Sequence, residues 1–252
     1  MKSVDLNADL GEGFGRYECG DDEALLAIVT SANVACGAHA GDPEIMARTF
    51  RLAKERGVSV GAHPGFPDLW GFGRRRIPFT LGEIERLVAY QIGAAQALAV
   101  YSGHRITYVK PHGALTNIAE VDRDVATAIA RAVRAVDMSL AILAPARCEQ
   151  LTAAASLQLK TVAEIYADRG YADNGTLLPR GTPGALIEDS ASAARRVLEM
   201  LRTDSIITAS GTGLPAEIGS ICVHGDSPHA VQTAKAVRAA LENASVRISA
   251  FS

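Results

Sequence analysis

The sequence predicts one α/β domain, folded as a seven-stranded β/α barrel. Short apolar runs alternate with helical patterns from one end of the 252 residues to the other, and no linker, low-complexity stretch or composition shift divides the chain. Strict alternation of this kind is typical of a parallel sheet, in which a helix connects each strand to the next. An open, doubly wound sheet is the alternative, because periodicity does not separate a closed sheet from an open one.

Seven runs have the length and apolar character of buried strands. In order, they are Ser3–Ala8, Asn33–Cys36, Val58–Ala62, Ile106–Val109, Leu140–Leu143, Thr161–Tyr166 and Ser220–Val223. Helical patterns lie between and after them, at Asp21–Ser31, Asp42–Arg56, Thr80–Val100, Asp122–Val136, Cys148–Ser156, Asp189–Leu201 and Ser227–Leu241.

Several of these helices have clear boundary signals. Asp42 suits an N-cap with Pro43 in the first helical position, and Gly57 follows the last turn. Thr80–Val100 has apolar residues along one face at a period of 3.6. One stretch departs from the alternation: Ser205–Gly219 has the pattern of a small hairpin.

Composition excludes several functional classes. The formal net charge of −3 gives no reason to expect a nucleic-acid or anionic-membrane surface. The N-terminus lacks the apolar region of a signal peptide, and no apolar run approaches the roughly 20 residues of a membrane helix. Four scattered cysteines without a CxxC pair indicate reduced thiols, so we expect a cytoplasmic protein.

Polar and ionisable residues follow the predicted strands repeatedly. Four of the six histidines, His39, His63, His112 and His224, stand just past a strand. In parallel β/α folds the active site lies at the carboxyl ends of the strands. A lone histidine there is more often a hydrogen-bonded cap than a catalyst, but four on one rim favour a functional site.

These positions give two sets of candidate residues. Carboxylates and imidazoles suited to acid–base catalysis are Asp9, Glu12, His39, His63 and His112. Residues suited to substrate binding are Asn7, Asp68, Arg74, Arg75, Lys110, Asn117, Arg169 and His224. One carboxylate with two or three histidines could also hold a divalent metal, and the spacing in sequence leaves this open.

The segment GAHPGFPDLWGFGRRRIPFT, residues 61–80, forms a long loop after the third strand. Long loops in compact domains are usually functional or disordered, and the aromatic residues of this one argue against disorder. We expect a lid that brings one or two of its guanidinium groups to a carboxylate or phosphate.

Common catalytic and nucleotide-binding motifs are absent. GEGFGRYECG is glycine-rich but does not meet the GxGxxG register, and there is no P-loop, HExxH or GxSxG pattern. Hydrolysis by an activated water therefore fits better than an acyl-enzyme. Cys36 lies near His39 but is more simply a buried thiol.

Six segments together resemble one known family. VDLNADLGEGFG, SANVACGAHAGDP, VGAHPGFPDLWGFGRR, VKPHGALTN, ADRGYADNGTLLPR and ICVHGDSPHAV occur in this order, from about Val4 to Leu241. They closely resemble the family of 5-oxoprolinase A subunits, also called LamB/YcsF. The chain departs from the family pattern at Ala8, Leu10 and Thr116, where Cys, Met and Tyr are usual.

The resemblance implies a seven-stranded barrel related to the glycoside hydrolase and deacetylase barrels. It also implies ATP-dependent opening of the 5-oxoproline lactam to L-glutamate together with subunits B and C, with ATP handled largely by these partners. Two alternatives stay open: a stand-alone, metal-dependent amide hydrolase or deacetylase, and a non-catalytic barrel that binds a small acid.

Overall fold

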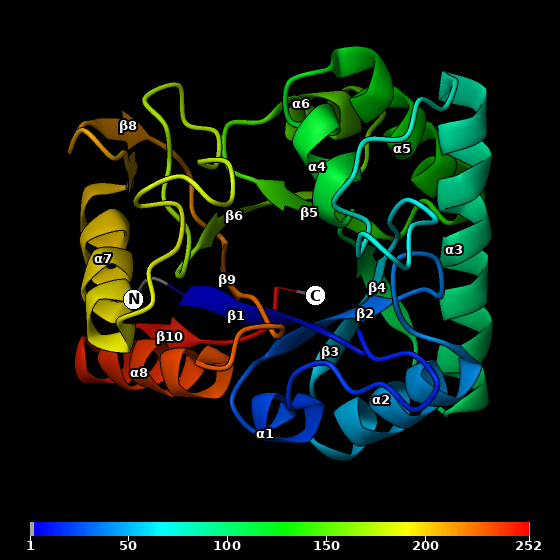
Figure 1. Cartoon of the computed structure of the whole chain (residues 1–252), viewed down its shortest axis with the longest axis horizontal. Coiled ribbons are helices and arrows are strands. Elements are labelled where there is room, and N and C mark those ends of the chain that lie inside the picture. The colour runs from blue at the N-terminus through cyan, green and yellow to red at the C-terminus, as the bar shows by residue number, and fades with distance from the viewer. Residues whose placement is uncertain (1–2, 252) are drawn as a thin grey trace.

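The structure, a computed structural model, describes residues 3–251 and contains a closed barrel of parallel strands inside a ring of helices (Figure 1). The barrel strands are β1 (Ser3–Leu10), β2 (Ser31–Ala35), β3 (Ser59–His63), β4 (Ile106–Val109), β5 (Ala141–Pro145), β6 (Thr161–Tyr166) and β9 (Ser220–Val223). Each pairs with the next, and β9 returns to pair with β1. The predicted seven-stranded barrel is confirmed, and the open-sheet alternative is wrong.

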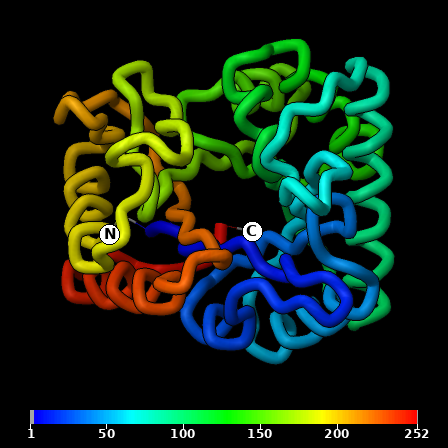
Figure 2. The backbone as a smooth tube through the Cα atoms, in the orientation of Figure 1, coloured from blue at the N-terminus to red at the C-terminus, as the bar shows by residue number. Residues whose placement is uncertain are grey.

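The helices lie outside the barrel, and Figure 2 shows the chain circling it. They are α1 (Asp22–Leu26), α2 (Pro43–Glu55), α3 (Leu81–Tyr101), α4 (Gly113–Ala119), α5 (Arg123–Val136), α6 (Glu149–Ser156), α7 (Ser190–Thr203) and α8 (Ala230–Asn243). Asp42 caps α2 through the amides of Glu44 and Ile45, as its sequence predicts. Across residues 3–251, no helix has the length and apolar character needed to cross a membrane.

Several local features differ from the sequence predictions. The first helix ends at Leu26, because Ser31 already pairs with β1 and starts β2. The second strand therefore begins two residues earlier than expected and ends at Ala35. Helix α4 was not predicted, and neither was the short strand β10 (Arg247–Ile248), which pairs with the start of β1.

The hairpin of β7 (Ser205–Ile207) and β8 (Gly213–Pro215) forms as predicted. Its two strands pair in antiparallel fashion and make a separate two-stranded sheet. The hairpin thus interrupts the alternation of strands and helices between α7 and β9 without joining the barrel.

The two faces of β1 have opposite chemistry. Val4, Leu6, Ala8 and Leu10 belong to the apolar core between the barrel and its helices. Because side chains alternate along a strand, the residues between them point into the barrel. That inner row is Asp5, Asn7 and Asp9, all buried. Asp9 thus lies within β1 and not after it, which corrects the predicted end of this strand at Ala8.

Candidate active site at the carboxyl ends of the strands

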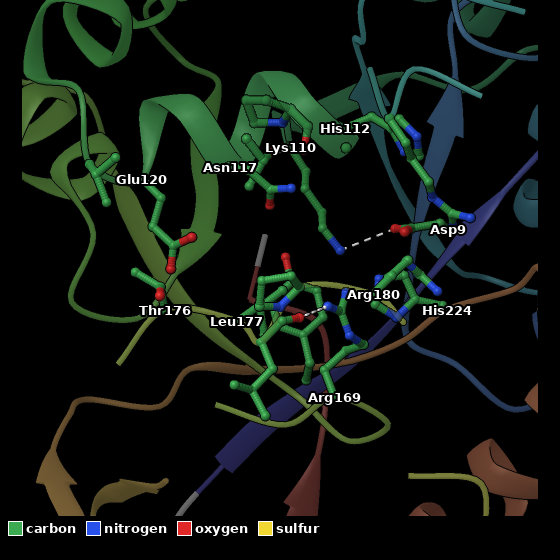
Figure 3. A pocket seen from close by; sticks show the side chains of 18 of the residues that line it. Asp9, Lys110, His112, Asn117, Glu120, Arg169, Thr176, Leu177, Arg180 and His224 are labelled. Atoms are coloured by element: carbon green, nitrogen blue, oxygen red, sulfur yellow. Dashed lines mark hydrogen bonds and ion pairs between the residues drawn. The ribbon is translucent and has the colours of Figure 1, made fainter. Parts of the chain in front are cut away.

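A cavity of about 490 Å³ opens at the carboxyl ends of the barrel strands (Figure 3). Its volume lies within the range of small-molecule sites. Predicted site residues that line it are Asp9, His63, Arg74, Lys110, His112, Asn117, Arg169 and His224. The strand ends therefore do bring most of these residues to one place.

Lys110 is the centre of a buried charge network on the cavity floor, and Figure 3 shows its side chain reaching toward Asp9. Its Nζ lies 3.1 Å from Asp9 Oδ1 and 3.1 Å from Glu164 Oε2. Burial opposes the charged form of Lys110, but the attraction of Asp9 and its neighbours outweighs it and raises the pKa well above the ordinary value. The same attraction overcomes burial at Asp9 and holds the pKa of that carboxyl well below its usual range.

A layer of amide and hydroxyl groups supports this network from inside the barrel. Asn33 Nδ2 donates to Asn7 Oδ1 at 2.7 Å and to Asp9 Oδ1 at 2.8 Å. Asn7 Nδ2 donates to Ser220 Oγ at 2.8 Å, and the Tyr108 hydroxyl donates to Asn33 Oδ1 at 2.7 Å. Asn7 is therefore placed below the cavity, where it positions Asp9 and Lys110, and it is not among the lining residues.

Three histidines and one glutamate form a second buried cluster beside Asp9. The rings of His39 and His112 stack at 3.7 Å, and the ring of His63 stands at 85° to that of His112. Glu12 Oε1 lies 3.2 Å from His39 Nε2 and 3.4 Å from His112 Nδ1. One potential ligand atom from each of these four residues lies within 4.8 Å of the other three.

Burial controls the charge of this cluster. It holds the pKa values of His39 and His112 well below their ordinary value, so both rings are neutral near pH 7. Burial and the neighbouring Asp9 raise the pKa of Glu12 well above its ordinary value.

Two glycines allow this close packing. A Cβ on Gly65 would lie 2.7 Å from His39 Nδ1, and one on Gly73 would lie 2.6 Å from His39 Cβ. Gly73 also has a φ of +64°, a conformation that favours glycine. Any larger residue at either position would push the histidines apart.

The long loop after β3 packs against the histidine cluster. Its Phe72 carbonyl accepts a hydrogen bond from His112 Nε2 at 2.8 Å. Arg74 lines the cavity and pairs with Asp226 at 2.6 Å. Arg75 instead donates a hydrogen bond to Asp68 within the loop. Neither of these two residues lines the cavity. The loop thus brings one of its two predicted guanidinium groups to the site.

Arginine side chains and a histidine form the opposite wall. His224 Nδ1 lies 3.0 Å from Asp168 Oδ1, and its ring stacks on Tyr166. Arg169 donates to the backbone carbonyls of Ala185 and Leu178, which fixes the residues around Arg180 over the cavity.

Arg180 lines the cavity and was not singled out from the sequence, although it ends the segment ADRGYADNGTLLPR. Within residues 3–251, it makes no ion pair. Burial, followed by the charges of Arg74 and Arg169, lowers its pKa. Three guanidinium groups around one cavity favour an anionic ligand.

Glu120 is a second lining residue that the sequence did not reveal. It directly follows α4, and no pattern marked it because that helix was not predicted. Burial raises the pKa of its carboxyl to about 7, although the charge of Arg169 acts in the opposite direction. A carboxyl that titrates near neutral pH can exchange protons with a substrate.

The raised pKa of Glu120 predicts a pH-dependent stability. Between its ordinary value of 4.5 and the folded value of about 7, the folded chain binds a proton that the unfolded chain has lost. Its contribution is therefore fully present below pH 4.5 and is lost as the pH rises to 7. Glutamine does not ionise, so the Glu120→Gln variant should not lose this stability as the pH rises. The unfolding free energy of the variant minus that of wild type should therefore be larger at pH 8 than at pH 5, by up to about 3 kcal/mol.

Urea unfolding at the two pH values would measure this difference. Glu217→Gln, at an exposed glutamate, is the matched control and should show no such dependence. Equal effects of Glu120→Gln at pH 5 and pH 8 would contradict the assignment.

Two cysteines lie beside site residues, although neither lines the cavity. Cys36 is buried and its pKa is raised to about 12 by burial, so it stays a thiol, in keeping with the predicted packing role. Cys222 does more than pack, because its Sγ lies 3.0 Å from Lys110 Nζ.

A parallel β/α barrel with carboxylate, imidazole and cationic groups at the carboxyl ends of its strands has the architecture of the barrel enzymes. The model of the LamB/YcsF family matches residues 4–252. The chain belongs to this family.

Relatives in this family match over the full length. The chain is 63% identical to the 5-oxoprolinase A subunit of Azorhizobium caulinodans, covering 100% of this chain and 99% of that one. It is 56% identical to the 5-oxoprolinase A subunit of Gluconobacter oxydans, covering 99% and 98%.

Solved structures agree with the fold. The lactam utilization protein from Thermus thermophilus superimposes with a TM-score of 0.93 at 43% identity, and each chain is fully covered. A GH113 β-1,4-mannanase, at a TM-score of 0.56 and 10% identity over 96% of this chain and 99% of its own, shares the fold alone.

Proposed function

We propose that this chain is the A subunit of an ATP-dependent 5-oxoprolinase and opens the lactam ring of 5-oxo-L-proline to give L-glutamate. Full-length relatives are named as A subunits of 5-oxoprolinase, and the similar Thermus protein is named for lactam utilization. The observation in the site that carries the proposal is the cavity itself, with buried acid–base groups on its floor and arginines around its wall.

The chemistry of the lactam explains the need for ATP and partners. A lactam is a stable amide, and phosphorylation of its carbonyl oxygen makes the ring carbon a better electrophile. We assign that phosphorylation to subunits B and C in the cytoplasm, where ATP is available, since this sequence has no P-loop. The activated substrate then carries a carboxylate and a phosphate, two anions that suit Arg74, Arg169 and Arg180.

Hydrolysis of the activated ring needs proton transfer at two atoms. A water adds to the ring carbon and gives a proton to a base, and the C–N bond breaks as the ring nitrogen takes a proton. The resulting acyl phosphate reacts with a second water to release glutamate and phosphate. Asp9 and His112 line the floor and offer the base, with Glu12 in contact with His112 behind them, while Glu120 offers an acid at the wall.

The dependence on partners is testable. The isolated chain should release no glutamate from 5-oxoproline, with or without ATP, because the unactivated lactam is inert. With subunits B and C present, glutamate should appear as ATP is consumed, in equal amounts. Chromatographic assay of glutamate and ADP would measure both.

The control is a mixture of subunits B and C without this chain. Robust glutamate release by the isolated chain without ATP would contradict the proposal and favour a stand-alone amide hydrolase. Full activity of subunits B and C alone would favour a non-catalytic role for this chain.

A further inference from the structure

Two histidine nitrogens on the cavity floor face each other at short range. His63 Nδ1 lies 2.6 Å from the backbone oxygen of Lys110, and His112 Nε2 lies 2.8 Å from that of Phe72. A carbonyl oxygen only accepts hydrogen bonds, so each of these nitrogens carries a proton. The remaining nitrogens, His63 Nε2 and His112 Nδ1, lie only 3.0 Å apart, and Asp9 Oδ1 lies 3.5 Å from His63 Nε2.

In the form in which neither of these nitrogens carries a proton, their lone pairs face each other, and a bound cation would relieve the repulsion between them. A third electron-pair donor, Glu12 Oε1, is 3.4 Å from His112 Nδ1, and all three side chains are buried. We propose that Glu12, His63 and His112 bind one divalent metal ion of the zinc type on the cavity floor.

The distances agree with tetrahedral coordination. Zinc binds histidine nitrogen at about 2.0–2.1 Å, which places neighbouring ligand atoms of a tetrahedron about 3.3–3.4 Å apart. The separations of 3.0 Å between His63 and His112 and 3.4 Å between His112 and Glu12 lie close to that edge. The ring planes of the two histidines cross at 85°, so both lone pairs can point at one ion.

The surroundings of the two rings also resemble a metal site. Metal-binding histidines usually donate their other N–H to a carboxylate, a backbone carbonyl or water, which fixes the ring and its tautomer. Both His63 and His112 do so with a backbone carbonyl. The rings are thus held ready for an ion by the end of β4 and by the long loop.

His39 has a different role, because its ring is parallel to that of His112 at 3.7 Å. In-plane lone pairs of two parallel rings do not meet at one point, so the two cannot share an ion in this arrangement. His39 Nε2 instead contacts Glu12 Oε1 at 3.2 Å, and its buried Nδ1 has no hydrogen-bond partner within residues 3–251. We therefore assign His39 as a positioning residue for Glu12.

Three protein ligands leave a coordination position for water, which is the pattern of catalytic zinc sites. His63 and His112 line the cavity, so that position is accessible to a substrate. A bound ion of this kind lowers the pKa of its water to near 7 and supplies a nucleophile at neutral pH. This role in the reaction rests on the proposed function, whereas the binding of the ion does not.

Metal binding can be tested on the isolated chain. After treatment with a chelator, the wild-type chain should bind one Zn²⁺ by calorimetry, and Co²⁺ in its place should give the visible absorption of a low-coordinate site. His63→Ala, His112→Ala and Glu12→Gln should lose this binding. His39→Ala should retain it with an affinity about 10–100-fold weaker, as expected for a residue that orients a ligand. His229→Ala, at an exposed histidine, is the matched control and should bind as wild type.

Failure of the wild-type chain to bind one ion would overturn the site, and this result does not depend on the folding of any variant. Binding that persists unchanged in His63→Ala and His112→Ala would overturn it as well.

The role of the ion is tested separately in the complex with subunits B and C, with excess Mg²⁺ for ATP. Mg²⁺ prefers oxygen ligands and is not expected to replace zinc at two histidines. Activity lost on chelation and restored by Zn²⁺ supports the role, and full activity of the zinc-free complex overturns it. If the complex makes no glutamate in any state while the chain binds zinc, the proposed function fails and the metal site stands.

Discussion

Replacement of Lys110 by methionine is expected to destabilise the fold by about 3–5 kcal/mol, as is usual when one partner of a buried ion pair is removed. Methionine has a similar length but no charge, so Asp9 and Glu164 would be left as buried carboxylates without their shared cation. For a chain of this size the loss corresponds to a Tm lower by roughly 6–20 °C.

Thermal melts followed by circular dichroism would measure this change. Lys235→Met, at an exposed lysine on α8, is the matched control and should leave the Tm nearly unchanged. Equal melting temperatures for the Lys110 and Lys235 variants would show that Lys110 does not hold the network together. Its part in binding the substrate could then be read from kinetics without a folding defect.

The second large effect is expected on turnover. His112→Ala should lower kcat of the complete three-subunit complex by about 10²–10⁴-fold, the usual contribution of a group that acts in proton transfer. Loss of a metal ligand would act in the same direction. His112 occupies the N-cap of α4 but makes no capping hydrogen bond with its side chain, so helix capping is not its role.

Steady-state kinetics of the complex, together with melts of the isolated variant, would separate the two roles. His229→Ala should keep both its turnover and its Tm. A folded His112→Ala chain with undiminished turnover would remove His112 from the mechanism, whereas a large fall in Tm with normal specific activity would make it structural.

Much of the barrel follows from local patterns in the sequence. Seven apolar runs and their following helices are recognisable because strand and helix periods differ, and boundary residues such as Asp42 act on their own backbone. His63, Lys110 and His112 could be placed at the rim for the same reason, since each stands at or just past a strand end. The resemblance of six segments added the family, which the matching model confirms.

Other site residues depend on elements that no local pattern revealed. Thr116, Asn117 and Glu120 lie on or just after α4, a short helix that opens with Gly113. Its position depends on Gly73 of the long loop, whose carbonyl accepts from the Ala114 amide. Glu120 therefore reaches the cavity through a contact between segments some forty residues apart, and burial at that place gives its carboxyl the raised pKa.

Closure of the sheet into a barrel determines that the polar face of β1 points inward. The alternation of Asp5, Asn7 and Asp9 with apolar residues along β1 equally fits a strand with one face in water. These residues turn inward because β1 pairs with β9, where Asp5 lies opposite Ser220. The sequence alone determined which residues share a face of β1, but only that long-range pairing made the face the inside of a closed barrel. There, out of contact with bulk water, the carboxylates must be satisfied by Lys110, Asn33 and Ser220.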